Sequence, residues 1–185
     1  ELIERRPDES ITISIAGKTR VFEQLAMVEF DSDRKRMSVL LRAPNGEIVL
    51  YTKGADTVIF NLLHQGEDQL VLNTTRDQVD AFAQQGLRTL VCAWRLVTQE
   101  EAAQFMELYN QANLQIEDRD RAVKEVGARL EHDLVLLGAV AIEDQLQPNV
   151  PETISYLSQM DIRLWILTGD KKETAISIAK STNVI

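Results

Sequence analysis

The chain has 185 residues, of which 44% are hydrophobic and 26% charged, a composition typical of a folded globular protein and not of a disordered one. Acidic residues outnumber basic ones by 29 to 20, and the net charge of −9 argues against a general nucleic-acid or anionic-membrane surface. The longest uncharged apolar run, residues 134–142, is far shorter than the ~20 residues that span a bilayer. The chain begins with Glu1 and not with Met, so we expect it to be part of a longer protein.

Alternating apolar and polar residues predict an antiparallel sheet in the first half of the chain. The period-two patterns cover residues 10–15, 21–30, 37–43 and 47–51. Pro44-Asn45-Gly46 separates the last two segments and favours a tight hairpin, because Asn and Gly accept a positive φ.

The middle of the chain combines helices with one further strand. Helical periodicity predicts helices over residues 55–63, 74–85 and 116–132, and another from Thr98 onward. Thr98-Gln-Glu-Glu101 has the pattern of a capping box, and Gly86 is placed to stop the second helix. Residues 88–97 are expected to form an apolar strand, in which Cys92 is interpreted as a packed side chain and not as a nucleophile.

The last third of the chain changes to a β-α-β-α pattern. Strands are predicted over residues 134–142 and 163–167, and helices over 150–160 and 173–180. This order favours a parallel sheet with a right-handed crossover, and it makes Trp165 a core residue. We therefore expect one domain over residues 1–142, a hinge over 143–148 and part of a second domain over 149–185.

The sharpest local motif is Leu167-Thr168-Gly169-Asp170-Lys171, at the predicted end of a strand and start of a helix. Ligands of open α/β sheets bind beyond the carboxyl ends of strands, where a helix N-terminus offers free N–H groups to a phosphate. Thr168 could add a hydroxyl donor. The alternative interpretation is a well-capped turn that binds nothing.

Three other positions could contact a nucleotide. Phe30 precedes the basic triplet Arg34-Lys35-Arg36 and could stack a base, or it could be an edge-strand aromatic beside a solvated turn. Lys53 lies where a helix begins, a place that disfavours a cation unless an anion is present, although surface lysines are common. Arg88 enters an apolar strand and could clamp a phosphate or pair with a carboxylate. No Cys/His spacing indicates a metal site.

Six segments, taken in order and spacing, carry a family resemblance: Glu29 to Val39, Tyr51 to Ile59, Gly86 to Leu90, Ala141 to Gln147, Val150 to Ile154 and Trp165 to Lys171. They resemble the cytoplasmic region of type IV P-type ATPases, the phospholipid flippases. The Lys-Gly-Ala and Thr-Gly-Asp motifs occur across P-type ATPases. Arg-Lys-Arg-Met-Ser-Val and Ile-Glu-Asp-x-Leu-Gln are typical of the flippase branch.

The resemblance implies an α/β (α+β) fold: the antiparallel sheet and flanking helices of a nucleotide-binding domain, followed by a partial haloacid-dehalogenase-like parallel β-α-β-α segment. It also implies roles for individual residues. Phe30 matches the aromatic that stacks on adenine, and Lys35 matches a nearby basic contact. Lys53 matches the lysine deep in the nucleotide pocket, and Arg88 the arginine that bridges toward the phosphates. Thr168, Gly169 and Asp170 match the loop beside the phosphorylated aspartate. Asp144 falls in the hinge between the two domains.

The resemblance also implies what the parent protein does. It would be an integral membrane ATPase that forms an aspartyl-phosphate and moves phospholipid, and this region of it would face the cytosol. Its cofactors would be ATP and Mg²⁺, and its partners could include an accessory subunit. Asp-Lys-Thr-Gly-Thr and Gly-Asp-Gly-x-x-Asp are absent from the sequence, so this chain is expected to bind nucleotide without carrying the nucleophile or most magnesium ligands. The alternatives are part of a soluble haloacid-dehalogenase-type phosphatase, or a non-catalytic nucleotide-binding or interaction domain.

Overall fold

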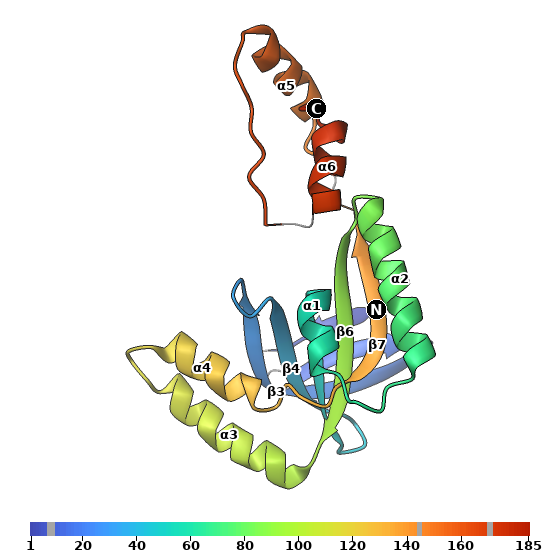
Figure 1. Ribbon diagram of the computed structural model, residues 1–185. Coiled ribbons are helices and arrows are strands. Elements are labelled where there is room, and N and C mark those ends of the chain that lie inside the picture. The colour runs from blue at the N-terminus through green and yellow to red at the C-terminus, as the bar shows by residue number, and fades with distance from the viewer. Residues whose placement is uncertain (7–9, 144–145, 170–171) are drawn as a thin grey trace. The chain divides into compact units, whose positions relative to one another are not determined.

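The computed structural model describes residues 1–6, 10–143, 146–169 and 172–185 (Figure 1). Contacts divide the chain into two compact units, one of residues 1–67 and 91–138 and the other of residues 68–90 and 139–185. Within the described ranges no helix has the length and apolar character needed to cross a membrane.

A sheet of seven strands forms the framework, and its strands follow one another in chain order from β1 to β7. Their bounds are β1 (Leu2–Arg5), β2 (Ser10–Ile15), β3 (Lys18–Asp31), β4 (Arg36–Arg42), β5 (Ile48–Gly54), β6 (Arg88–Val97) and β7 (Val135–Ile142). Strands β1 to β6 pair antiparallel with their neighbours, which confirms the predicted antiparallel sheet. The turn between β4 and β5 forms at Asn45-Gly46 as predicted, with Gly46 at φ 85° and its N–H donating to the Ala43 carbonyl.

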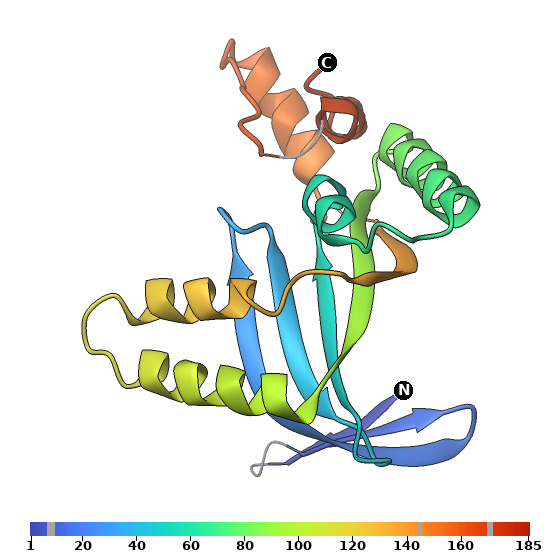
Figure 2. The same ribbon diagram turned by 60° about the horizontal axis from the view of Figure 1, so that its bottom comes forward.

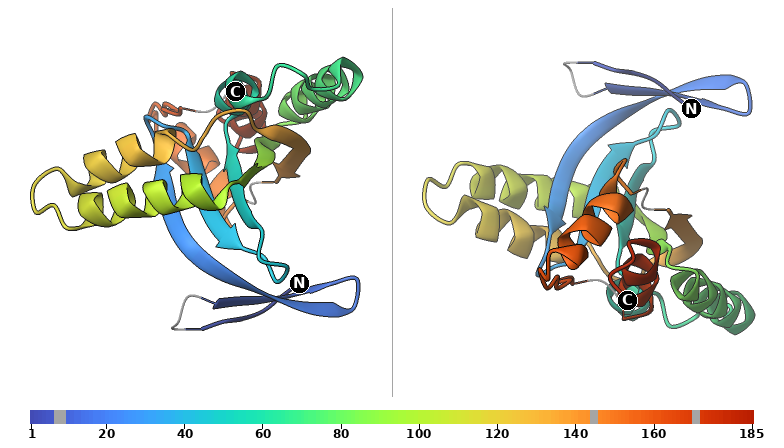
Figure 3. Two further views of the ribbon diagram at one scale, coloured as in Figure 1. Left: turned by 90° about the horizontal axis from the view of Figure 1, so that it is seen from below. Right: turned by 90° about the horizontal axis from the view of Figure 1, so that it is seen from above.

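Strand β3 is long and curved, and it joins two parts of the sheet (Figure 3). Its first half, from Lys18 to Glu23, pairs with β2, and its second half, from Glu23 to Asp31, pairs with β4. The pairing with β4 shifts register between Val28 and Asp31. Such an irregularity re-aims the side chains near it, here those at the end of the strand.

The first unit also holds the short helix α1 (Asp56–Ile59), the 3₁₀ turn η1 (Phe60–Leu62) and the longer helices α3 (Gln99–Asn113) and α4 (Arg119–Ala128). Helices α3 and α4 lie side by side across one face of the sheet (Figure 2). The predicted cap of α3 is confirmed, because the Thr98 side chain accepts a hydrogen bond from the Glu101 N–H at 3.1 Å. Helix α4 is shorter than predicted and ends at Ala128, because the next residues leave the helix and enter the core: Leu130 and Glu131 are both buried.

The core of the first unit lies between the sheet and these two helices. Alternate residues such as Leu40, Leu50 and Ala93 are buried on this covered face. Gly127 of α4 packs closely on β3, since a Cβ there would lie 2.7 Å from a methyl group of Val28. The Tyr109 hydroxyl of α3 donates to the backbone carbonyl of Met27 at 2.9 Å and ties the helix to the sheet.

The second unit contains α2 (Gln69–Gln84), α5 (Val150–Gln159) and α6 (Lys172–Ser181). Helix α2 begins earlier than predicted, because the Asp68 side chain accepts from the Leu70 N–H and caps it there. It ends as predicted, with Gly86 following at φ 81°. Helices α2 and α6 pack together, and a Cβ at Gly86 would overlap the Ser177 side chain.

The strand predicted over residues 163–167 is wrong. Residues 162–168 have neither helical nor strand structure, so no parallel β-α-β-α sheet forms among the described residues of the second unit. Trp165 is 84% exposed and Leu167 is 96% exposed, so Trp165 is not a core residue. The physical reason is that a strand needs a neighbour for its N–H and C=O groups, and no described strand pairs with this segment.

Candidate functional site

The sheet face opposite α3 and α4 is partly open to solvent, and we call it the open face. Lys53 of β5 lies between Met37 of β4 and Cys92 of β6 in the register, so these three side chains share a face. Lys53 and, two residues earlier, Tyr51 are both exposed, whereas Thr52 between them is buried on the covered face. The open face therefore places an ammonium group beside partly buried apolar side chains.

The cysteine on this face is a packed side chain. Burial raises the pKa of the Cys92 thiol, and the positive charge of Lys53 only partly opposes this rise. The thiol is therefore protonated at neutral pH, which agrees with its interpretation as a small apolar residue.

Phe30 also belongs to the open face. Asp31 pairs with Arg36 across the β3–β4 ladder, and its carboxylate forms an ion pair with Lys124 of α4, so Asp31 points to the covered face. The register shift between Val28 and Asp31 places Glu29 and Phe30 together opposite Met37, which shares the open face with Lys53. Its side chain is 62% exposed. An exposed aromatic ring thus stands at the end of β3, on the face that carries Lys53.

The turn over residues 31–36 is held by its own polar groups. The Asp31 carboxylate accepts from the backbone N–H groups of Asp33 at 2.9 Å and Arg34 at 3.2 Å. The hydrogen bond from Lys124, together with these backbone donors, holds the pKa of Asp31 below its usual value. Lys35 has a left-handed backbone with φ 52°, and its side chain is exposed.

Gly54 lets the 31–36 turn approach the end of β5. The Ala55 N–H donates to the Lys35 carbonyl at 2.9 Å. A Cβ at Gly54 would lie 2.5 Å from that carbonyl oxygen and 2.6 Å from the Cβ of Arg36. Only glycine fits this contact, so the glycine of the Lys-Gly-Ala motif has a packing reason: it brings Lys35 close to the strand end that carries Lys53.

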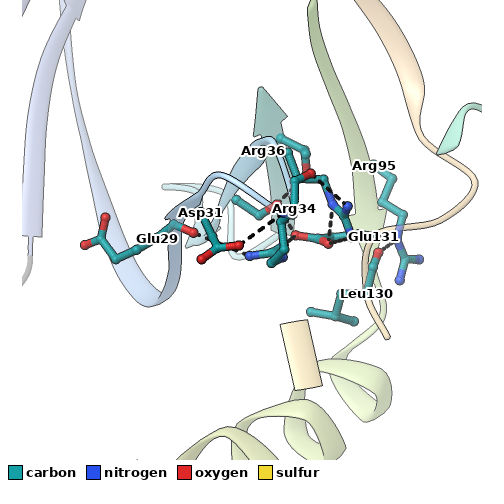
Figure 4. A network of polar contacts seen from close by, with 9 residues as sticks. Glu29, Asp31, Arg34, Arg36, Arg95, Leu130 and Glu131 are labelled. Atoms are coloured by element: carbon teal, nitrogen blue, oxygen red, sulfur yellow. Dashed lines mark hydrogen bonds and ion pairs between the residues drawn. The ribbon is translucent and has the colours of Figure 1, made fainter. Parts of the chain in front are cut away.

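A buried carboxylate that the sequence analysis missed lies behind this turn (Figure 4). The Glu131 side chain is 0% exposed and forms ion pairs with both Arg34 and Arg36. Its Oε2 accepts from Arg36 Nε at 2.7 Å, and its Oε1 accepts from Ser38 Oγ at 2.6 Å. Ser38 also bonds to Thr52 across the strands at 2.9 Å.

Electrostatics keep this carboxylate ionised. Burial alone would raise the pKa of Glu131, but hydrogen bonds from Arg34 and Ser38 and the charges of Arg34 and Arg36 outweigh it and lower the pKa. Both arginines are thus paired with Glu131, whose single negative charge offsets one of their two positive charges, and of the basic triplet only Lys35 is an exposed side chain. No sequence pattern could reveal this, since Glu131 lies 97 and 95 residues from its partners.

The remaining predicted site residues belong to the second unit or lie outside the described residues. Arg88 is the first residue of β6 and is exposed. Thr168 and Gly169 are exposed and end the irregular segment. Asp144 and Asp170 lie outside the described residues.

The first unit therefore brings together an exposed aromatic ring, two ammonium groups and a partly buried apolar surface. The residues are Phe30, Lys35, Lys53, Met37 and Cys92. Such a surface can stack a planar ring and attract an anion. Among residues 1–6, 10–143, 146–169 and 172–185, no group of three or more His, Cys, Asp or Glu side chains could hold a metal ion.

Comparison with known proteins gives a consistent picture. A family model described as P-type ATPase, cytoplasmic domain N, matches residues 8–149. The chain is 45% identical over 179 residues to phospholipid-transporting ATPase FetA of Mus musculus, covering 97% of this chain and 15% of that protein. It is 46% identical over 173 residues to phospholipid-transporting ATPase IC of Homo sapiens, covering 94% and 14%. It is 43% identical over 178 residues to phospholipid-transporting ATPase DNF1 of Chaetomium thermophilum, and the match covers 96% of this chain and 11% of that protein.

Proposed function

This chain belongs to the P-type ATPases, within their cytoplasmic domain N, and we therefore propose that it is the ATP-binding region of a phospholipid-transporting ATPase. The observation that carries the proposal is the open face, where Phe30, Lys35 and Lys53 gather at one end of the sheet. The chain spans only 11–15% of the length of the three relatives. ATP hydrolysis and lipid transport would therefore be activities of the longer parent protein.

The open face would bind the nucleoside end of ATP. The exposed ring of Phe30 offers a stacking surface for adenine, and the side chains of Met37 and Cys92 provide an apolar floor. The ammonium groups of Lys53 and Lys35 supply positive charge beside it, in a chain whose net charge is otherwise −9. This charge would attract the anionic part of the ligand.

The remaining proposed contacts of the nucleotide are Arg88, Thr168, Gly169 and Asp170. Arg88 would reach toward the phosphates, because a guanidinium binds phosphate oxygens through two parallel hydrogen bonds. We assign residues 149–185 to part of a haloacid-dehalogenase-like phosphorylation domain, with residues 143–148, including Asp144, as the hinge. Its loop of Thr168, Gly169 and Asp170 would then lie beside the aspartate that the parent protein phosphorylates.

The parent protein would be an integral membrane ATPase whose cytosolic part includes this chain. The partners of the parent protein could include an accessory subunit. The parent protein would pass through an aspartyl-phosphate intermediate and move phospholipid, the cargo that its relatives' names state. Mg²⁺ would enter with the ATP phosphates and neutralise their charge. No group of three or more His, Cys, Asp or Glu side chains among the described residues could hold a metal ion, and most ligands of Mg²⁺ would lie outside this chain. The relatives are named transporters and not soluble phosphatases, which favours this function over the alternatives.

Isothermal titration of the 185-residue chain with ATP tests the proposal, with Phe30→Ala as the variant. Loss of the stacking ring should weaken ATP binding roughly 5- to 150-fold, since base–aromatic stacking contributes about 1–3 kcal/mol. Tyr156→Ala is the matched control, because Tyr156 is similarly exposed at 65% but lies on α5. Absence of binding at millimolar ATP in the unmutated chain would contradict the proposal, and so would equal affinities of Phe30→Ala and Tyr156→Ala.

A further inference from the structure

The 31–36 turn joins the two faces of the sheet. It presents the exposed side chain of Lys35, and the exposed ring of Phe30 lies just before it in the chain. On the covered side its two arginines, Arg34 and Arg36, reach the single carboxylate of Glu131 (Figure 4). The residues that would contact nucleotide and the residues that hold the turn are therefore different, and they are adjacent in sequence.

Glu131 is the principal anchor of Arg34. The other hydrogen bond of the Arg34 side chain is a long one of 3.4 Å to the Glu29 carbonyl, and its buried Nε has no partner among the described residues. The Arg34 side chain is only 9% exposed. Without the Glu131 charge, its guanidinium would remain buried and uncompensated, so it would have to turn toward water and carry the backbone of the turn with it.

The same carboxylate also fixes the conformation of Lys35. It binds the residues on both sides of Lys35, whose left-handed φ of 52° is costly for any residue with a Cβ. With both neighbours held at one point, the backbone between them must loop outward. The Lys35 carbonyl is then in place to accept from the Ala55 N–H, which links the turn to the end of β5.

We propose that Glu131 is a positioning residue of the nucleotide site: it sets ATP affinity, without touching ATP, by holding the 31–36 turn through Arg34 and Arg36. This inference rests on the proposed function of the open face. It assigns a binding role to a buried residue on the opposite side of the sheet, beyond the end of α4.

The test compares Glu131→Gln with the unmutated chain by ATP titration and by amide hydrogen exchange. Glutamine keeps the size of the side chain but removes its charge, and it replaces one accepting oxygen with an NH2 group that cannot accept a hydrogen bond from an arginine. We expect ATP affinity to fall at least about fivefold. The amide of Lys35, which donates to the Asp31 carbonyl, and that of Ala55, which donates to the Lys35 carbonyl, should exchange at least about tenfold faster. The amides of Leu50 and Ala93 in the buried sheet should keep their protection.

Glu67→Gln is the matched control, because Glu67 is a half-buried carboxylate of the same unit that accepts from the Leu136 N–H. It should change neither ATP affinity nor exchange at Lys35. If Glu131→Gln does not fold, Ser38→Ala replaces it. This variant keeps both ion pairs of Glu131 and removes one hydrogen bond to it, together with the bond between Ser38 and Thr52, so it should act in the same direction with a smaller effect.

The outcomes separate the inference from the function on which it rests. An unmutated chain that fails to bind ATP would overturn the proposed function and the role of Glu131 with it. An unmutated chain that binds ATP, with Glu131→Gln or Ser38→Ala binding within twofold of it, would overturn the role of Glu131 alone. Equal loss of protection at Lys35, Leu50 and Ala93 would show a merely structural role, which also overturns the inference.

Discussion

Replacement of Gly54 by alanine should separate the 31–36 turn from the end of β5. The new Cβ would lie 2.5 Å from the Lys35 carbonyl oxygen and 2.6 Å from the Arg36 Cβ. Ordinary contacts between such atoms begin near 3.5 Å, so the turn and the strand must part by about 1 Å. That movement would break the 2.9 Å hydrogen bond from the Ala55 N–H, which contributes about 1 kcal/mol, and overpacking costs about 1–3 kcal/mol more. The free energy of unfolding should thus fall by about 2–4 kcal/mol.

Urea denaturation and ATP titration of Gly54→Ala measure the two effects. ATP affinity should fall together with stability, because the displaced turn carries Lys35. Gly17→Ala is the control: Gly17 has φ 77° and nothing within 4 Å of its would-be Cβ, so this change should cost about 1–2 kcal/mol through backbone strain and leave ATP affinity unchanged. A Gly54→Ala variant with unmutated stability and affinity would refute the close approach and its role in the site.

Two further predictions concern stability, and both are measured by urea denaturation. The pKa of Glu131 is lowered in the folded protein, so its ionised form contributes stability above the ordinary pKa of 4.5 that is lost as the pH falls through the lower folded value. The free energy of unfolding should therefore drop on acidification below pH 4.5, and this drop should be smaller in Glu131→Gln. An equal change of the free energy of unfolding with pH in the unmutated chain and the variant would contradict the prediction. Thr98→Ala removes the side chain that caps α3 and should lower the free energy of unfolding by about 1 kcal/mol, whereas no loss would show that the cap is not needed.

The local features of the fold could be predicted because a few adjacent residues decide them. Asn45-Gly46 forms its turn, Thr98 caps its helix and Gly86 follows its helix end, each through hydrogen bonds or backbone angles within a few residues. The segment from 163 to 167 has the apolar pattern of a buried strand, but a strand forms only where a second strand, often far away in sequence, pairs with it. Among the described residues none pairs with it, and Trp165 and Leu167 are exposed.

The candidate site shows the same division. The sequence indicated Phe30, Lys35 and Lys53 by residue type and motif, and the structure gathers these three residues in the first unit. In the sequence, Arg34 and Arg36 form one basic triplet with Lys35, whereas the structure pairs both arginines with Glu131. That pairing joins positions 95 and 97 residues apart, and only the folded sheet and α4 bring them together.

The central claim is that ATP binds on the open face of the sheet, and amide chemical-shift mapping of the unmutated chain tests it most directly. On titration with ATP, the largest shifts should fall at Phe30, Lys35, Met37, Lys53 and Cys92. The amide resonances of α3, which lies on the covered face, should not shift. A spectrum that does not change at millimolar ATP, or shifts confined to α3 and α4, would contradict the claim.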